Sequence, residues 1–267
     1  MDTALRPRKD HLVVASALCL LASAAAAQAT DVDPIVTDRP GFLFSPILVP
    51  EGRLQIESGL PTFTQVRGDG SESRTWSLPF AARYGLSDLV ELRASLPTWS
   101  DVHTDGGGST TDDRGFSDIE IGAKFALDPS TETPLAIQGS LRLPTGEDGF
   151  TTDAVGGSLY LLHTRELANG MGITGMLGAT YAPADGGPDP LAGAIGVLLW
   201  SPIAGDLSGY VEAAAFPGIE DVAGQSFAGG ALVWTASNDV QFDLSADFGL
   251  DDDSADVIAA FGVSVRL

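Results

Sequence analysis

The clearest pattern in this chain is a strict alternation of apolar and polar positions near its C-terminus. In residues 240–250 the six even positions are apolar and the odd ones are mostly polar; residues 256–267 repeat the pattern with apolar side chains at the odd positions. A period of two indicates a β-strand whose two faces meet different surroundings. The chain stops on the apolar phase, at Leu267, which is typical of a barrel closed inside a membrane.

Segments of the same kind recur along most of the chain, separated by clusters of Gly, Pro, Asp, Asn and Ser. We predict twelve strands, at residues 53–66, 73–84, 88–99, 117–127, 134–143, 156–167, 171–182, 191–200, 207–216, 225–235, 240–250 and 256–267. No stretch shows sustained helical periodicity, and no apolar run after residue 29 approaches the length of a transmembrane helix. The prediction is an all-β fold, a transmembrane antiparallel up-and-down β-barrel, since bacterial single-chain barrels have even strand numbers.

The connections between these strands differ on the two sides of the predicted barrel. With the C-terminus at the periplasmic side, the outward connections are 67–72, 100–116, 144–155, 183–190, 217–224 and 251–255. The periplasmic ones are uniformly short: 85–87, 128–133, 168–170, 201–206 and 236–239. The outward set includes the longest connections and holds sixteen acidic residues against two basic ones, Arg67 and Arg114. Outer-membrane barrels show this asymmetry of long loops and tight turns.

Charged residues in the middle of the strands alternate with the apolar face, so we expect them to face the lumen. A buried unpaired charge is costly, whereas a wet lumen or a partner of opposite sign makes it tolerable. Five are basic and six acidic, so they could select permeants or pair across the lumen and close it. The predicted pore-lining set is Glu57, Arg83, Glu91, Arg93, Glu120, Lys124, Arg142, Glu212, Asp243, Asp247 and Arg266.

The N-terminus has the pattern of a cleaved signal peptide. A basic head at residues 6–9 precedes an apolar run at 12–21, and small residues then lead to an A-x-A cleavage pattern at 27–29. The apolar run is short for a bilayer span, which disfavours the alternative of a membrane anchor. We therefore expect export.

Three regions follow from this interpretation. Residues 1–29 form the signal peptide, 30–52 an extended N-terminal segment, and 53–267 the β-barrel. Cleavage removes the one cysteine, Cys19, so the mature protein has no thiol chemistry. A cysteine-free exported barrel is expected in the outer membrane of a Gram-negative cell.

The charge balance narrows the range of partners. The chain has 14 basic and 36 acidic residues, a net charge of −22, which excludes nucleic acid as a partner because phosphate contacts need a basic surface. Acidic stretches at 105–113 and 251–253 could hold Ca²⁺ or bridge cations to lipopolysaccharide phosphates, but the spacing of an EF-hand is missing and solvated loops are favoured. We expect no metal and no cofactor, and outer-membrane lipid and lipopolysaccharide as surroundings; the oligomeric state stays open.

Motifs of enzymes are missing. Neither G-x-S-x-G nor H-E-x-x-H occurs. His163 is interpreted as a wall residue, and Ser158, five residues earlier on the same predicted strand, falls on the opposite face. We therefore predict that the protein is not an enzyme.

Several short strings, taken in order, resemble one family. They are Thr37-Asp38-Arg39-Pro40, residues 49–59, 84–93 and 115–124, and Leu-Arg-Leu-Pro-Thr-Gly at 141–146. Together with the last two strands they look like the outer-membrane transporter-like barrels of the MetA-pathway phenol-degradation family. The resemblance implies a barrel that takes up small, often aromatic or apolar, compounds. One departure is the terminal residue, since such barrels usually end in Phe and this one ends in Leu267.

Two motifs allow a functional and a structural interpretation. The N-terminal motif Thr37, Asp38, Arg39 and Pro40 could enter and narrow the lumen; we favour a simple turn, with Asp38 bonding the local backbone. Arg142, before Pro144-Thr145-Gly146, could place a cation at the pore mouth; we favour a strand end, since Pro cannot donate to the ladder. The overall prediction is a barrel passing small molecules, with a structural or surface-interaction barrel of closed lumen as the alternative.

Overall fold

A computed structural model describes residues 33–128, 133–181, 183, 191–219 and 223–267. The predicted signal peptide, residues 1–29, lies outside the described residues, as do parts of the predicted connections 128–133, 183–190 and 217–224. The strands are β1 (Leu54–Gly68), β2 (Ser71–Ser87), β3 (Val90–Gly106), β4 (Ser109–Phe116), β5 (Ile119–Asp128), β6 (Leu135–Leu143), β7 (Gly156–Glu166), β8 (Gly172–Tyr181), β9 (Leu191–Ala204), β10 (Leu207–Phe216), β11 (Gly218–Ile219), β12 (Gln225–Ser237), β13 (Val240–Gly249) and β14 (Val257–Arg266). A short 3-10 helix, η1 (Ala168–Gly170), connects β7 and β8. Within the described ranges, no helix has the length and apolar character needed to cross a membrane.

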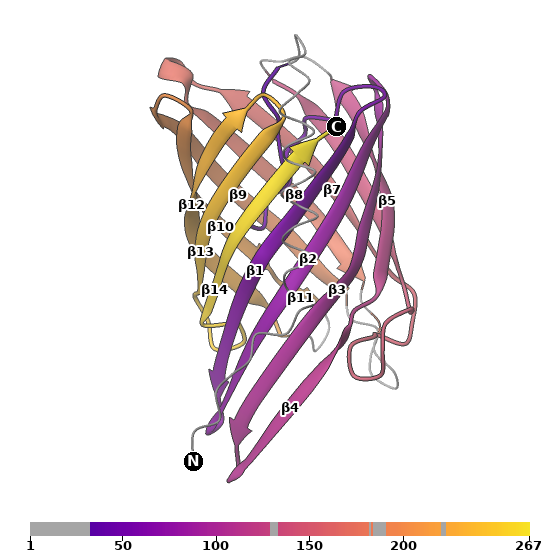
Figure 1. Cartoon of the computed structure of the whole chain (residues 1–267), viewed down its shortest axis with the longest axis vertical. Helices are drawn as coiled ribbons and strands as arrows, with labels where there is room; N and C mark the ends of the chain where they lie inside the picture. Colours follow the sequence, from indigo (N-terminus) through magenta and orange to yellow (C-terminus); the bar gives the residue numbers. More distant parts are fainter. Residues whose placement is uncertain (1–32, 129–132, 182, 184–190, 220–222) are drawn as a thin grey trace, which may run out of the picture.

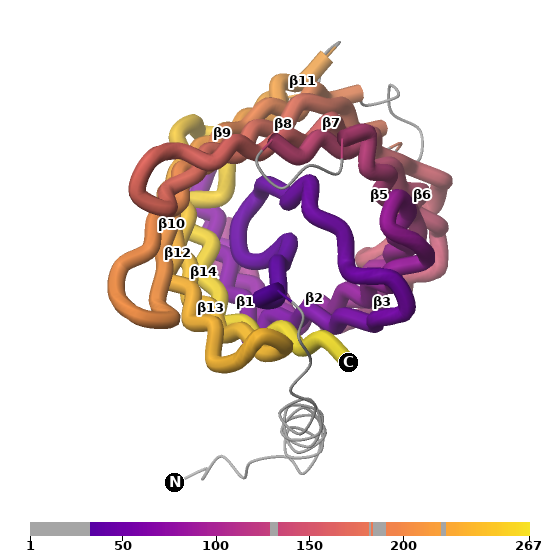
Figure 2. Tube along the Cα trace, turned by 90° about the horizontal axis from the view of Figure 1, so that it is seen from above, coloured from indigo at the N-terminus to yellow at the C-terminus, as the bar shows by residue number. Residues whose placement is uncertain are grey.

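Twelve of these strands form one closed antiparallel barrel (Figures 1 and 2). Around the ring the order is β1, β2, β3, β5, β6, β7, β8, β9, β10, β12, β13 and β14. β14 pairs back to β1, and the backbone N–H of Leu267 donates to Leu54 O at 2.7 Å. β4 pairs with β3 and β11 with β9, which extends the wall at the end opposite the C-terminus. The predicted fold class is confirmed, and each of the twelve predicted segments overlaps a strand of the ring.

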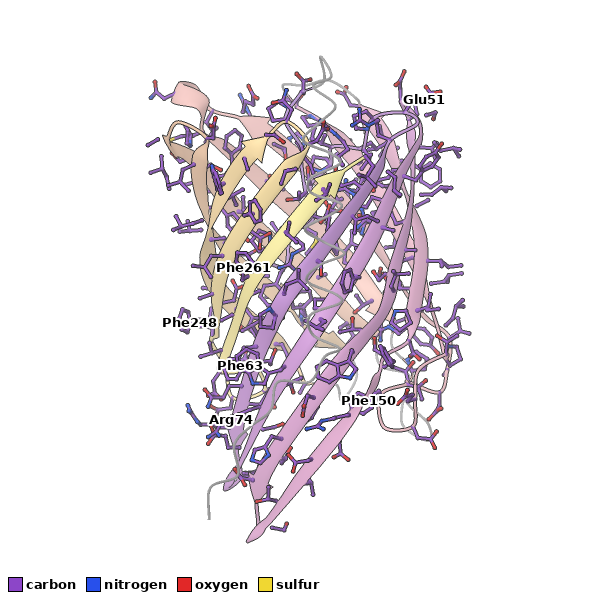
Figure 3. The ribbon with its side chains drawn as sticks, viewed as in Figure 1. Glu51, Phe63, Arg74, Phe150, Phe248 and Phe261 are labelled. Atoms are coloured by element: carbon purple, nitrogen blue, oxygen red, sulfur yellow. The ribbon has the colours of Figure 1, made fainter. Side chains whose placement is uncertain are left out.

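The wall is apolar outside and polar inside, as the alternation predicted. In β13, Leu244 and Phe248 are 58% and 52% exposed, whereas Asp243 and Asp247, which directly precede them, are each 3% exposed. Phe248 and Phe261 project from the outer surface in Figure 3. An apolar outer band around a polar interior is the arrangement of a barrel that meets lipid on its outside.

The connection 100–116, which we expected to be a loop, is instead a β-hairpin. β3 continues to Gly106, and β4 pairs back along it from Ser109 to Phe116. The tip is a two-residue turn in which Gly107 and Gly108 have positive φ, as tight hairpins require. Both faces of this hairpin are polar and lie beyond the apolar band, so the alternation used for prediction is absent there although the backbone ladder is complete.

A line of register breaks crosses the wall from β1 to β5, and we call it the proline seam. The ladder is interrupted at Pro61 in β1, at Pro79 in β2, at Pro97 in β3 and at Ser117–Asp118 between β4 and β5. Proline cannot donate a backbone hydrogen bond to a neighbouring strand, so each proline ends one stretch of pairing. Because each interruption faces the next one, the breaks form a continuous line.

Residues 33–52 fold back into the barrel, and we call them the re-entrant segment (Figure 2). The N–H of Ile35 donates to Asn238 O in the turn between β12 and β13, and Glu51 bridges to Gly85 near the end of β2. Both ends of the segment therefore lie at the rim that carries the C-terminus, the C-terminal rim. Gly41, near its deepest point, has a φ of +98°, and a Cβ there would come within 2.1 Å of Glu212 Oε1.

Candidate functional site: the barrel lumen

The carboxylate of Asp38 holds the re-entrant segment against one side of the lumen. Its oxygens lie 2.5 Å from Arg93 Nη1, 3.1 Å from Lys124 Nζ and 3.7 Å from Arg83 Nε. The backbone N–H of Ser45 also donates to it, at 2.8 Å. Burial raises the pKa of Asp38, but the charges of Arg83, Lys124 and Arg93 outweigh burial and hold the pKa well below its usual range. Asp38 is therefore a buried carboxylate kept ionised by three cations of the wall.

Arg83 joins this cluster to the wall and to the segment. Its Nη1 lies 2.8 Å from Glu57 Oε1, and its Nη2 lies 2.8 Å from Glu91 Oε2. The same guanidinium donates to the backbone oxygens of Val36 and Ile47, at 3.2 and 3.1 Å. The side chain is 1% exposed, so these partners provide the hydrogen-bond acceptors that water would provide at the surface.

Backbone amides of the segment donate to carboxylates all around the inner wall. The pairs are Asp38 N with Glu57, Val49 N with Glu91, and Phe42 N with Glu212, at 3.1, 2.8 and 3.1 Å. Side chains add two further contacts: Arg39 Nη2 lies 3.3 Å from Asp243 Oδ1, and the Tyr210 hydroxyl donates to Pro40 O. The segment is thus attached to β1, β3, β10 and β13 as well as to the cluster around Asp38.

The C-terminal rim has an ion-pair network of its own. Arg266 Nε lies 2.7 Å from Asp239 Oδ1, and Arg53 Nη2 lies 3.2 Å from the same oxygen. Arg266 also donates to Asp33 O at 2.7 Å. These contacts connect the closing strand β14 to Asp33, at the start of the re-entrant segment, and, through Asp239, to Arg53, the residue that follows its end.

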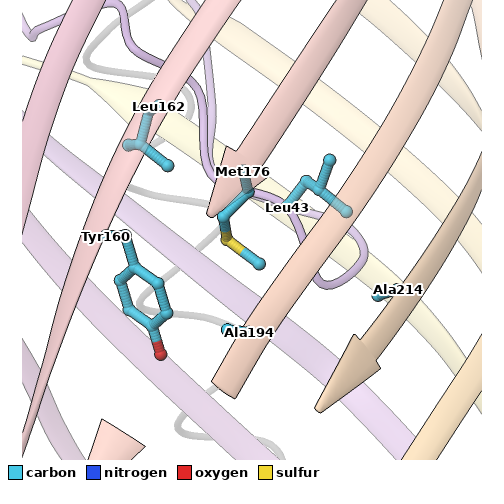
Figure 4. Packing of buried hydrophobic residues seen from close by; sticks show 6 residues of the cluster. All are labelled: Leu43, Tyr160, Leu162, Met176, Ala194 and Ala214. Carbon is cyan, nitrogen blue, oxygen red and sulfur yellow. The ribbon is translucent and has the colours of Figure 1, made fainter. Parts of the chain in front are cut away.

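An apolar cluster lies on the side of the lumen formed by β7 to β10. Leu43 of the segment packs against wall residues that are all buried, namely Tyr160, Leu162, Met176, Ala194 and Ala214 (Figure 4). Two phenyl rings flank Leu43: Phe42 stacks on Phe227 with centroids 4.5 Å apart, and Phe44 lies 5.3 Å from Tyr160. The lumen therefore has a charged side and an apolar, aromatic side, with the segment between them.

All eleven residues of the predicted inward-facing set are buried or half-buried. Glu57, Arg83, Glu91, Arg93 and Lys124 meet around Asp38, and Arg266 lies at the C-terminal rim. Glu120 and Arg142 are paired in register across β5 and β6, and Glu120 lines a cavity of about 50 Å³ together with Phe44, Arg93, Ser95, Gln138 and Ser140. The remaining three, Glu212, Asp243 and Asp247, lie on β10 and β13.

The favoured interpretation of the N-terminal motif as a simple turn is wrong. Thr37 does bond locally, to Arg39 O, and Asp38 accepts from Ser45. The charged groups of the motif, however, pair with residues that are 45 to 204 positions away along the chain. The motif carries two opposite charges next to each other, and each finds its counterpart in a different part of the wall.

Pattern reasoning missed the neutral polar residues and rings of the lumen. Gln55, Gln138 and Gln241 are each under 5% exposed, and Gln55 bonds Val36 O while Gln241 bonds Thr37. Their inward phase along the strands was a usable signal. The apolar run Phe42-Leu43-Phe44 was a second signal, because such a run in an exported loop needs a surface to cover it.

The turn after Arg142 has the structural role that we favoured. The carboxylate of Asp118 accepts the N–H groups of Thr145, Gly146 and Thr152 at 2.9 to 3.0 Å. Pro144-Thr145-Gly146 thus ends β6 and starts a loop, 144–155, that is folded around Asp118.

Ser158 and His163 lie on opposite faces of β7. The Ser158 hydroxyl bonds Ser140 inside the barrel at 2.6 Å, whereas His163 is exposed outside and bonds Pro134 O. In the described part of the chain, no group of three or more His, Cys, Asp or Glu side chains has an arrangement that could hold a metal ion.

Comparisons with known proteins agree with this architecture. The model of a family described as "Putative MetA-pathway of phenol degradation" matches residues 37–267. The fold is similar to that of the COG4313 outer membrane channel from Pseudomonas putida F1 (TM-score 0.67, 11% identity, 85% of this chain and 100% of that chain). It is also similar to the translocator domain of the autotransporter NalP from Neisseria meningitidis (TM-score 0.55, 12% identity, 96% of this chain and 95% of that chain). No curated protein sequence matches the chain.

Proposed function

Because the chain belongs to the family of the MetA-pathway of phenol degradation, we propose that it is an outer-membrane channel for small aromatic or apolar molecules. The observation that carries the proposal is the division of the lumen. Tyr160, Leu162 and Met176 offer an apolar surface of the kind an aromatic ring would enter, opposite the charged cluster at Asp38. We propose the eleven inward-facing charged residues as the polar part of the permeation path.

The proposed location follows from the outside of the barrel and from the N-terminus. The wall presents large apolar side chains such as Leu177 and Val211, which are 59% and 62% exposed, and these would be covered by lipid. Residues 1–29 are proposed to direct export and to be removed. The polar hairpin of β3 and β4 would then stand in the lipopolysaccharide layer.

A closed-lumen structural barrel is the second candidate, and one observation favours it. The re-entrant segment is held by ion pairs on one side and by packed rings on the other, so in this conformation it occupies the path. As a channel, the protein must loosen these contacts when a permeant enters.

Planar-bilayer conductance and liposome swelling test the proposal. We expect the wild type to conduct weakly, and a variant without residues 33–45 to conduct strongly because the lumen is then free. A folded barrel that passes no solute in either form would contradict the channel. Heat-modifiable migration on a gel identifies the folded state in each sample.

The proposal includes no enzymatic step. A hydrolase at the membrane rim would need a serine and a histidine together, and Ser158 and His163 are on opposite faces of the wall. Assay of the purified protein with ester and phospholipid substrates is the corresponding test.

A further inference from the structure

The proline seam lies within the part of the wall that spans the membrane. Pro61 is the eighth residue of β1 counted from Leu54 at the C-terminal rim, and Pro97 is likewise the eighth residue of β3. A tilted transmembrane strand needs about 9–11 residues to cross the hydrocarbon core. The interruption therefore falls in the far half of that core, where unpaired backbone normally occurs only beside a cavity or under a protein cover.

The wall is held weakly where the seam passes between β3 and β5. The ladder ends at the pair of Ser95 and Glu120 and resumes at Trp99 and Phe116. Two hydrogen bonds bridge the interval: Ser117 N to the oxygen of Thr98 at 3.0 Å, and Thr98 N to Ser117 Oγ at 2.9 Å. Since Pro97 has no N–H, separating the strands here leaves fewer orphan donors than separating an intact stretch of ladder would.

The lipid-facing and lumen-facing sides of this interval differ: the first is apolar and the second opens on a cavity, as a passage between lipid and lumen would require. On the lipid side, Leu96 and Phe116 border it and are 46% and 45% exposed. On the lumen side lies the cavity of about 50 Å³ that Phe44, Ser95 and Glu120 help to line. A cavity of this size holds a few waters, each of which needs roughly 10–15 Å³, and it is too small for an aromatic ring while Phe44 lines it.

The loop 144–155 packs against the interval. The ring of Phe150 lies on Gly115, so closely that a Cβ there would come within 2.4 Å of it, and Glu147 N donates to Phe116 O at 2.9 Å. Asp118, inside the interval, binds the same loop through the three amides described above. The loop is therefore attached to Gly115, Phe116 and Asp118, where β4 passes into β5.

We propose that the interval between β3 and β5 is a lateral opening through which small apolar molecules pass between the lumen and the membrane core. The inference rests on the proposed channel function and names its route. The end-on route leads past loops with sixteen acidic residues and two basic ones, and these charged side chains provide no favourable contact for an apolar solute. The lateral route ends in lipid, where burial of apolar surface is favourable by about 25 cal/mol per Å².

A reversible cross-link tests the route. Thr98→Cys with Ser117→Cys, in a Cys19→Ser background, joins the two strands under oxidation. The matched control is Thr164→Cys with Thr174→Cys, on β7 and β8, where the hydroxyls are 2.7 Å apart within a continuous ladder. Uptake of radiolabelled naphthalene and of benzylamine, a cation at neutral pH, is measured in cells, with benzylamine reporting the end-on path past the acidic connections.

We expect oxidation of the Thr98–Ser117 pair to reduce naphthalene uptake to that of cells without the protein, and a reductant to restore it. Uptake of benzylamine should not change, and the oxidised control pair should take up both solutes as the wild type does. Unchanged naphthalene uptake, or an equal loss for both solutes, would overturn the lateral opening while leaving the channel in place. If the wild type takes up neither solute, the proposed function itself fails.

A second pair of variants covers the case in which the cysteine pair does not fold. Leu96→Asn places a polar group at the lipid side of the interval, and Leu232→Asn places one on β12 at a similar exposure of 49%. The first should lower naphthalene uptake and the second should not. Equal uptake by the two variants would count against the route.

Discussion

The carboxylate of Asp38 meets cations from three neighbouring strands, β2, β3 and β5. None of these cations could be left buried without a partner at low cost, so the aspartate and the wall stabilise each other. Removing one member of a buried ion pair typically costs about 3–5 kcal/mol when the partner is left uncompensated. Arg83 and Arg93 keep their contacts with Glu57 and Glu91, so Lys124 is the cation whose ion pair is lost. The inner end of the segment thus depends strongly on one side chain.

Asp38→Asn should release the re-entrant segment without preventing barrel formation. We expect a higher single-channel conductance and a lower temperature for the heat-modifiable transition. Asp112→Asn is the control, since Asp112 pairs with the exposed His103 and surface pairs contribute about 0–1 kcal/mol. Equal conductance of the two variants would show that Asp38 does not hold the segment.

The pH dependence of the stabilisation by Asp38 follows from the lowered pKa of its carboxyl group. A depressed folded-state pKa gives stability that is present above the unfolded pKa, about 3.9 for Asp, and lost as the pH falls through the folded value. The difference in transition temperature between wild type and Asp38→Asn should stay constant from about pH 7 to pH 5. A difference that vanishes near pH 6 would contradict this assignment.

Parity along the strands places charged residues on the inner face, but it does not identify their partners. Arg83 was expected to face a wet lumen or an opposite charge; it also meets Val36 O and Ile47 O of a segment that precedes the barrel. Such contacts join positions far apart in sequence, and no local pattern encodes the path of residues 33–52.

At the scale of elements, the alternation of apolar and polar residues located every strand of the ring, because successive side chains of each strand face the lipid and the lumen in turn. It failed for the hairpin of β3 and β4 beyond the membrane, because both faces are polar there: Asp101 and His103 lie on one face, and Thr104 and Asp113 lie on the other. The proline seam was not predicted either, since a single Pro in a strand does not reveal that its neighbours carry one at the same height.

Asp118→Ala should free the loop 144–155 from the wall. Hydrogen bonds to a charged group contribute about 1.5–3 kcal/mol each, and three backbone amides lose their acceptor. We expect faster cleavage by added protease within residues 147–153 of the folded barrel. Asp105→Ala, at an exposed position of the β3 hairpin, is the control and should leave that cleavage unchanged.

For the whole molecule, the connections at one end of the barrel hold sixteen acidic and two basic residues, a net of −14 out of the −22 of the chain. A mouth with this charge attracts cations and repels anions over a Debye length of about 10 Å at 0.1 M salt. We therefore expect a cation-selective reversal potential in a dilute KCl gradient. At 1 M, where the length falls to about 3 Å, the selectivity should weaken. Anion selectivity in dilute salt would contradict a path past these connections.

The position of both ends of residues 33–52 at one rim bears on how the molecule is assembled. A strand that had to be threaded through a finished ring would need to be in place before Leu267 pairs with Leu54. A loop that enters and leaves by the same open end needs no such order. It can be inserted into an already closed cylinder, or withdrawn from it, without any wall strand coming apart. The topology is unknotted at every stage, and biogenesis of the cylinder and occupation of its interior can be separate events.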